Sequence, residues 1–248
     1  MQQYFSKQAQ PAENTDFTLD AADSYHLFTV MRAQENEQVQ VVFADKKLTL
    51  SAVNADLKSL RVLHTLERQI ELPLDVTIAV GLPKSDKLEF ITQKATELGA
   101  HEILAYPAEW SVTKLDAKKI VKKTERLNKI AKGAAEQSKR LMIPDVTILP
   151  SRKNLLTLFS QYDQVLVAYE ESAKSGELAA FAQSLKTAEV GQKLLVIFGP
   201  EGGISPDEIV AFTAEGASLI GLGPRIMRAE TAPLYVLSAV SFYQELLK

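Results

Sequence analysis

From Leu74 onward, short apolar runs alternate with segments of helical periodicity, and this alternation restricts the fold more than any other feature of the chain. It is typical of an α/β domain whose strands form a mostly parallel sheet. Strands are predicted at LDVTIAVGL, EILAYPA, VTILP, QVLVAYE, KLLVIFG and SLIGLG. Helices are predicted between and after these strands, at SDKLEFITQKATELG, LDAKKIVKKTERLNKIAKGAAEQSKRL, LTLFSQY, SGELAAFAQSL, SPDEIVAFTAEG and ETAPLYVLSAVSFYQELL.

Two of the predicted helices carry signals at their ends. In the first helix, Ser85 is expected to cap the amino end and Gly99 to end the helix. In the helix after KLLVIFG, Ser205 is the expected N-cap and Pro206 the first helical residue. The long basic helix has a candidate break at Gly133.

The amino-terminal part of the chain has a different pattern, which suggests a separate small domain. VQVVFA, LTLSAVN and SLRVLHTL predict strands of a small barrel or sheet, and DAADSYHLFTVMR, from Asp20, predicts one helix among them. The segment ERQIELP, which ends at Pro73, is the best candidate boundary. We therefore expect two domains, residues 1–72 and 73–248.

The 248-residue chain contains no cysteine, which excludes disulfides, thiolate metal sites and a cysteine nucleophile. The amino terminus lacks a signal-peptide pattern, and no stretch approaches the roughly 18 apolar residues that a spanning helix needs. We therefore expect a cytoplasmic protein without a membrane role. His26, His64 and His101 are scattered without partners at ligand spacing, so no metal site is expected.

The net charge of −3 is unevenly distributed along the chain. Between Trp110 and Arg140, ten lysines and arginines accompany three acids, so this segment has a net charge of +7. A basic segment in an acidic protein is a candidate footprint for a polyanion, because each neutralised phosphate releases counterions. The alternative is a solvated helix face. Trp110 is a candidate stacking surface for an RNA base, or else part of a core or interface.

Six of the eleven glycines fall within residues 199–223, around FGPEGG and LGPRIMRAETAP. Such clustering indicates tight turns or close approach of the backbone to a ligand. Because ligands bind at the carboxyl ends of parallel strands, the two segments are expected to form one pocket. A phosphate-binding loop would need Gly-Lys-Ser/Thr, which is absent here, and Glu201 would repel the phosphate. The spacing of the glycines also does not match a dinucleotide-binding fingerprint. A purely structural turn would not need two adjacent glycines beside a glutamate and a proline.

The residues IFGPEGGIS and LGPRIMRAETAPL resemble the carboxyl-terminal signature of the SPOUT superfamily of S-adenosylmethionine-dependent RNA methyltransferases. Within it they resemble the RsmE family, which methylates N3 of a uridine in small-subunit (16S) ribosomal RNA. LPKSDKLEFITQKATELG, PAEWSV and RLNKIAKGAAEQSKR resemble other blocks of that family in order and spacing. The chain departs from the family where members often have glycine, at Ser85 and Lys139, and where they often have tryptophan, at Leu127. FADKK also replaces a glycine-containing turn.

The resemblance implies an α/β fold, with a SPOUT-type trefoil knot in residues 73–248 and a PUA-like, RNA-binding β-barrel in residues 1–72. It implies S-adenosylmethionine as cofactor, small-subunit ribosomal RNA or the assembled subunit as partner, and a homodimer formed through the knotted domain. Leu222, Gly223 and Ile226 would face the adenine of the cofactor. The full set of residues implied to bind it is Phe198, Gly199, Pro200, Glu201, Gly202, Gly203, Leu222, Gly223, Arg225, Ile226, Met227 and Thr231.

Methylation at N3 requires loss of the uracil imide proton, and negative charge develops on the base. On the resemblance we expect Arg228 to face the base, Glu230 to position Arg228 or accept the proton, and Thr231 to form a hydrogen bond within the loop. The alternative is that Arg228 and Glu230 only tie down the knot. The residues expected to contact RNA are Lys84, Lys87, Lys118, Lys119, Lys122, Lys123, Arg126 and Arg140.

Two other classes of function remain as alternatives. A non-catalytic RNA-binding or ribosome-assembly factor on the same fold would not need the intact glycines and the complete RxxRxET run. A nucleotide-dependent metabolic enzyme would need a phosphate loop, and no such loop is apparent in the sequence. The sequence therefore favours the methyltransferase.

Overall fold

The computed structural model describes residues 1–170 and 179–247 of the chain. It divides into two compact units. The amino-terminal unit comprises Met1–Glu71 together with Ala135–Met142, and the carboxyl-terminal unit comprises Leu72–Ala134 and Ile143–Lys248. The domain boundary expected from the sequence, between residues 72 and 73, did not anticipate that Ala135–Met142 belongs to the amino-terminal unit. This segment contains the last turn of the long helix at Ala117–Ser138.

The amino-terminal unit is built on a five-stranded sheet with the order β1-β3-β4-β5-β2. The β1 and β3 strands pair in parallel, and the other neighbours are antiparallel. The helix expected from Asp20 is present as a short α-helix continued by a π-helical segment, with Asp20 as its N-cap. The elements are β1 (Gln3–Phe5), β2 (Asp16–Phe17), α1 (Ala21–Ser24), η1 (Tyr25–Val30), β3 (Gln38–Val42), β4 (Leu48–Val53) and β5 (Leu60–Leu66).

The carboxyl-terminal unit contains a six-stranded sheet with the order β11-β9-β10-β6-β7-β8, in which every pair of neighbours is parallel. This confirms the parallel sheet predicted from the alternating pattern. The strands are β6 (Asp75–Gly81), β7 (Glu102–Tyr106), β8 (Asp145–Ile148), β9 (Gln164–Ala168), β10 (Lys193–Phe198) and β11 (Ser218–Ile220).

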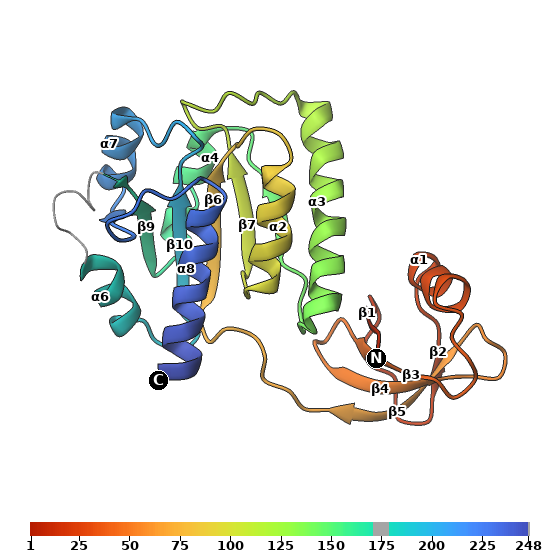
Figure 1. Ribbon diagram of the computed structural model, residues 1–248. Coiled ribbons are helices and arrows are strands. Elements are labelled where there is room, and N and C mark those ends of the chain that lie inside the picture. Colours follow the sequence, from red (N-terminus) through yellow and green to blue (C-terminus); the bar gives the residue numbers. More distant parts are fainter. Residues whose placement is uncertain (171–178, 248) are drawn as a thin grey trace. The chain divides into compact units, whose positions relative to one another are not determined.

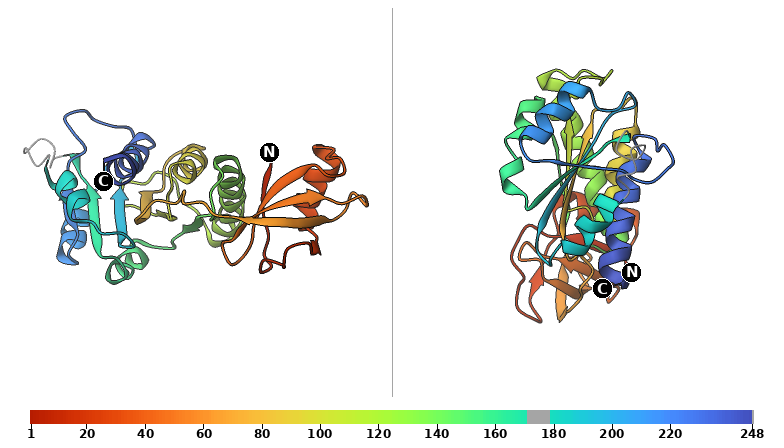
Figure 2. Two further views of the ribbon diagram at one scale, coloured as in Figure 1. Left: turned by 90° about the horizontal axis from the view of Figure 1, so that it is seen from below. Right: turned by 90° about the vertical axis from the view of Figure 1, so that its left-hand side faces the viewer.

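Helices cover both faces of this sheet (Figures 1 and 2). Buried residues of α2, α3, α6 and α8 share one core with the sheet, whereas buried residues of α4, η2 and α7 share the other. The two cores meet through alternate residues of one strand: Ile78 of β6 belongs to the first and Ala79 to the second. Burial on both faces explains why the strands read as continuous apolar runs. The helices are α2 (Lys87–Glu97), α3 (Ala117–Ser138), α4 (Arg152–Leu156), η2 (Phe159–Gln161), α6 (Ala179–Thr187), α7 (Pro206–Ala214), α8 (Thr231–Ser241) and η3 (Phe242–Leu247).

The expected helix ends are confirmed except at Ser85. Gly99, with φ +91°, follows the end of α2, and Ser205 caps α7 with Pro206 in its first turn. Ser85, however, has a left-handed φ of 55°, and Asp86 is the N-cap of α2 without a side-chain capping bond. The capping role predicted for Ser85 is therefore wrong. The break considered at Gly133 is also absent, because α3 is continuous across it.

Part of the helix predicted at SGELAAFAQSL, residues 175–178, lies outside the described residues. Within residues 1–170 and 179–247, no helix combines the length and apolar character needed to cross a membrane.

Candidate active site

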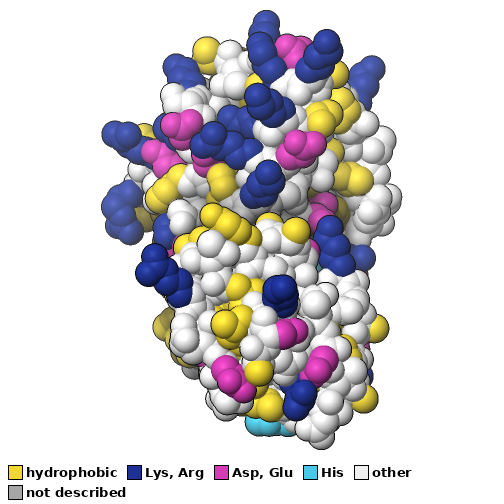
Figure 3. Space-filling view, turned by 90° about the vertical axis from the view of Figure 1, so that its right-hand side faces the viewer, with side chains coloured by type: hydrophobic (Ala, Val, Ile, Leu, Met, Phe, Trp, Pro, Cys, Tyr) yellow, Lys and Arg dark blue, Asp and Glu magenta, His cyan; other side chains and the backbone are white. Residues whose placement is uncertain are grey.

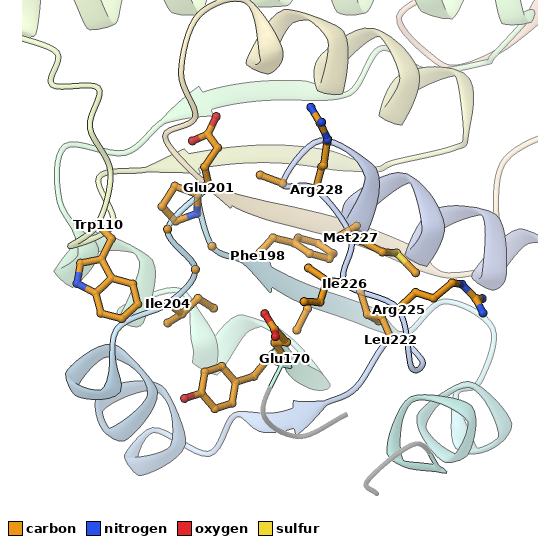
Figure 4. A pocket seen from close by; sticks show the side chains of 18 of the residues that line it. Trp110, Glu170, Phe198, Glu201, Ile204, Leu222, Arg225, Ile226, Met227 and Arg228 are labelled. Atoms are coloured by element: carbon orange, nitrogen blue, oxygen red, sulfur yellow. The ribbon is translucent and has the colours of Figure 1, made fainter. Parts of the chain in front are cut away.

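A cavity of about 840 Å³ lies where β9 and β10 end and the chain leaves β11. Figure 4 shows side chains from several separate segments around it, among them Trp110, Glu170, Phe198 and Ile226. The register of the sheet explains the location, because β9 lies between β10 and β11 and all three strands run in the same direction. The predicted single pocket at the carboxyl ends of these strands is therefore present.

The first wall of the cavity is the turn at residues 199–205, which follows β10. The N–H of Gly203 donates to the carbonyl of Pro200 at 2.9 Å, and Gly203 has a φ of +83°. A Cβ on Gly199 would lie 2.5 Å from the carbonyl carbon of Gly203, so the turn folds back on itself too closely for any side chain there. Gly199 and Gly203 are thus required by the turn itself, so the geometry of the turn accounts for glycines that the sequence analysis attributed to a ligand.

Trp110 packs against the outside of this turn. A Cβ on Gly202 would lie 3.1 Å from the Cβ of Trp110, and Trp110, which lines the cavity, remains 45% exposed. The segment that carries Trp110 is fixed to α7: the N–H of Glu109 donates to Glu208 Oε1 at 3.1 Å, and Ser205 Oγ donates to Glu109 Oε2 at 2.6 Å. Glu208 also completes a capping box with Ser205. These contacts hold the tryptophan and the first wall together.

The second wall is the loop at residues 221–230, between β11 and α8. Gly223 has a φ of +101°, which a residue with a side chain rarely adopts. Ile226, beside it in the cavity, exposes 77% of its surface. The N–H of Thr231 donates to the carbonyl of Arg228 at 2.9 Å, which joins the end of the loop to the first turn of α8. An apolar side chain exposed inside a cavity is a surface that a flat apolar ligand would cover.

A lysine from α2 connects the two walls. Lys87 Nζ lies 3.0 Å from Glu201 Oε1 in the first wall and 3.0 Å from Glu230 Oε2 in the second. These contacts, first with Glu201 and then with Glu230, raise the pKa of Lys87. Partial burial raises the pKa of each glutamate. Hydrogen bonds from their own backbone N–H groups and the contacts with Lys87 outweigh it, so both pKa values lie below the ordinary 4.5. All three groups are therefore charged at neutral pH.

Comparison with known proteins identifies the family. Residues 70–241 match the model of the RNA methyltransferase domain family. The ribosomal RNA small subunit methyltransferase E of Bacillus subtilis is 45% identical over 253 residues, covering 100% of this chain and 99% of that protein. The chain belongs to the RsmE family. The enzyme of the same name from Mycobacterium tuberculosis is 33% identical, and the match covers 90% of this chain and 84% of that protein.

Solved structures agree with the RsmE assignment at the level of the fold. A protein described as hypothetical superposes with a TM-score of 0.89 at 39% identity, and each chain is covered completely. The RsmE enzyme of Neisseria gonorrhoeae, crystallised with S-adenosyl methionine, superposes with a TM-score of 0.81 at 24% identity, with 97% of each chain covered.

Most of the residues that the RsmE signature marks for the cofactor line the one cavity. Eleven of the predicted residues do so, whereas Thr231 and Glu230 lie beside it, next to the lining residues Ala229 and Ala232. Arg228 also lines it. Lys87, which the sequence analysis assigned to RNA, also lines the cavity, and the end of β9, where Ala168, Tyr169 and Glu170 join the lining, was not predicted. The strand itself was predicted, so the rule that ligands bind at carboxyl ends was sufficient to find them.

The basic residues predicted to contact RNA fall into different environments. Lys118, Lys119 and Lys122 are exposed on α3, on the side of the carboxyl-terminal unit where Figure 3 shows many lysine and arginine side chains. Arg126 is also exposed but pairs with Glu89 of α2 at 2.8 Å. Arg140 requires a correction. Only 4% of its side chain is exposed, and it pairs with Glu71 at 2.6 Å, so it holds the amino-terminal unit together and is not available to phosphate.

Two of the three histidines contact polar side chains. His26 Nδ1 lies 3.0 Å from the hydroxyl of Tyr4, and His101 Nδ1 lies 3.0 Å from Asp75. In the described part of the chain, no three side chains of the metal-binding types cluster.

Proposed function

We propose that this chain uses S-adenosylmethionine to methylate N3 of a uridine in 16S ribosomal RNA. Membership of the RsmE family supports small-subunit ribosomal RNA as the substrate. The observation that carries the proposal is the cavity itself, because two glycine-rich loops from separate strand ends line it together with acidic and basic side chains.

The cavity suits the cofactor in size and chemistry. Its volume of about 840 Å³ lies in the range of small-molecule sites. Leu222, Gly223 and Ile226 would offer an apolar surface and unobstructed backbone groups to the adenine, while Gly199, Glu201 and Gly202 would face the ribose and methionine portion. When bound, S-adenosylmethionine supplies an electrophilic methyl group on a positively charged sulfur. The carboxylates at the cavity complement this positive charge.

The protein's own contribution is to bind the base and to accommodate the charge that forms on it. Arg228, which lines the cavity, is proposed to face the uracil and stabilise the negative charge that develops on its oxygens. Glu230 is the proposed positioning group or proton acceptor. Its lowered pKa keeps the carboxylate ionised, as a proton acceptor must be before it acts. Thr231 is proposed to support the loop from its first position in α8.

The finer features of the fold are part of the same proposal. We propose that residues 73–248 form a SPOUT-type trefoil knot, with the loop at residues 221–230 threaded beside the turn at residues 199–205. The contacts of α8 with β6, β10 and α2 support this path, since the chain must return from β11 past β9 to reach them. Residues 1–72 are proposed to be a PUA-like domain that binds RNA.

We further propose that the protein acts in the cytoplasm as a homodimer formed through its carboxyl-terminal unit. A second, smaller cavity of about 350 Å³ supports this, because apolar side chains of α6, α8 and η3 line it. Phe242 and Leu247 in this lining expose 54% and 63% of their surfaces. A second copy of the chain would cover them.

The deciding experiment is methyl transfer from labelled S-adenosylmethionine to small ribosomal subunits isolated from cells that lack this gene. The RNA is then digested and its nucleosides are identified by mass spectrometry. A new N3-methyluridine would establish reaction, substrate and position together. Binding of the cofactor without transfer would point to another substrate or assembly state, and neither binding nor transfer would favour a non-catalytic RNA-binding factor.

A further inference from the structure

Lys87 occupies a position that sequence reasoning assigned to RNA. Its ammonium lies 3.0 Å from one carboxylate oxygen in each of two loops, Glu201 of residues 199–205 and Glu230 of residues 221–230. The side chains of Lys87, Glu201 and Glu230 are 29%, 28% and 19% exposed, so each is partly buried. An ion pair with limited exposure is screened less than a surface pair.

A further hydrogen bond links Glu201 to the segment that precedes α2. The backbone N–H of Lys84, just before α2, donates to Glu201 Oε1 at 3.1 Å. Glu201 is therefore held from two points of the segment that leads into α2. The first turn of α2 thereby joins loops that follow β10 and β11, although these strands are not neighbours in the sheet.

The charges in this cluster are also complementary, with one ammonium between two carboxylates. Glu201 and Glu230 approach the same nitrogen atom, so without a cation between them their carboxylates would repel each other. The positive charge of Arg228, in the same loop as Glu230, also lowers the pKa of Glu230. The only other lysine of α2, Lys94, pairs with Glu97 on its own helix and contributes to neither loop.

We propose that Lys87 is a positioning residue that locks the two loops of the cavity to each other and thereby sets the shape in which the cofactor is bound. This inference rests on the proposed function for the identity of the ligand, but the coupling of the loops stands on the ion pairs. On this proposal the ammonium of Lys87 pairs with two carboxylates, and not with the RNA phosphate that the sequence analysis expected.

The test combines ligand binding with local hydrogen exchange. Titration calorimetry with S-adenosylhomocysteine avoids turnover, and hydrogen–deuterium exchange reports on the two loops in the full chain. Lys87→Met is expected to weaken binding about tenfold or more and to raise exchange in residues 199–205 and 221–230 together. Lys87→Arg keeps a cation in place and is expected to stay within about threefold of wild type. Lys94→Met is the matched control, since it removes a paired lysine from the same helix away from the cavity.

Binding of RNA separates this role from a phosphate contact. Lys87→Met is expected to leave RNA affinity and its salt dependence unchanged. A flatter salt dependence would overturn the proposal in favour of the RNA role, as would unchanged exchange in both loops. If Lys87→Met does not fold, Glu201→Gln is examined instead: raised exchange in residues 221–230 supports coupling, and an effect confined to residues 199–205 overturns it. Failure of the wild type to bind S-adenosylhomocysteine would count against the proposed function, while the exchange measurements would still test the coupling.

Discussion

Gly199 lies so close to the backbone of Gly203 that a methyl group on its α-carbon would come within 2.5 Å of the Gly203 carbonyl carbon. This contact explains why a glycine follows directly after strand β10. Gly133 in α3 is different, because a Cβ there would meet nothing within 4 Å and the fold does not require a glycine at that position. The two positions make a matched pair.

Gly199→Ala is therefore expected to destabilise the protein by about 1–3 kcal/mol and to abolish measurable cofactor binding, because the turn must open to admit the methyl group. Gly133→Ala is expected to stabilise it by roughly 0.5–1 kcal/mol, because alanine favours the helix interior. Chemical denaturation and calorimetry measure the two effects. Equal stability of both variants would contradict this view of the turn.

The predicted role of Arg228 can be separated from ligand binding by kinetics. Arg228→Met is expected to lower kcat for methyl transfer about 100-fold, as loss of one group that stabilises developing charge does in other enzymes. The dissociation constant for the cofactor is expected to stay within a few-fold of wild type. Arg228→Lys keeps the charge and should recover part of the rate. Weaker cofactor binding with an unchanged kcat would assign Arg228 to the loop structure.

The charge network at Lys87 predicts a defined dependence on pH. The pKa values of Glu201 and Glu230 are lowered, so their contribution to stability is present above the ordinary carboxyl value of 4.5 and is lost as pH falls through the depressed values. The pKa of Lys87 is raised, so its contribution is present below 10.5 and is lost as pH rises beyond the raised value. The difference in melting temperature between wild type and Lys87→Met is therefore expected to be constant between about pH 5 and 10 and to shrink outside that range. A step between pH 6 and 8 would contradict it.

The parts of the fold that followed from the sequence are those decided by local pattern. The β6 and β10 strands are buried on both faces, so each reads as an uninterrupted apolar run. The end of α2 was found from Gly99 and the start of α7 from Ser205 and Pro206, because these signals act within one turn of helix.

The errors concern residues whose environment depends on distant partners. Arg140 reads as part of a basic surface, but Glu71, 69 residues away, buries it in an ion pair. Ser85 and Lys139, where the sequence analysis expected glycine from the family pattern, both adopt left-handed φ values, of 55° and 65°. A glycine would adopt this conformation without the strain that a side chain introduces. Leu127 is fully buried in the core, so a substitution at this position would affect packing.

The basic face of α3 predicts a salt-dependent affinity for RNA. If Lys118 and Lys122 contact phosphates, the double change to glutamate should weaken binding and flatten the plot of log affinity against log salt. The expected loss is a slope of about 0.7–0.9 for each lost contact. Lys193, an exposed lysine at the amino end of β10, is the control position, and Lys193→Glu should leave the slope unchanged. An unaltered slope in the double variant would make α3 an ordinary solvated face.

Trp110 gives a direct optical report on the cavity, because it is the single tryptophan of the chain. Trp110 lines the cavity, is 45% exposed and packs its Cβ against Gly202. Binding of S-adenosylhomocysteine should therefore change its emission, and the change should saturate with the dissociation constant measured by calorimetry. Trp110→Phe should keep the calorimetric affinity within a few-fold and lose the optical signal. If emission stays constant while calorimetry shows binding, the ligand does not contact Trp110. The turn at residues 199–205 would then have to contact the ligand with its side that faces away from Trp110.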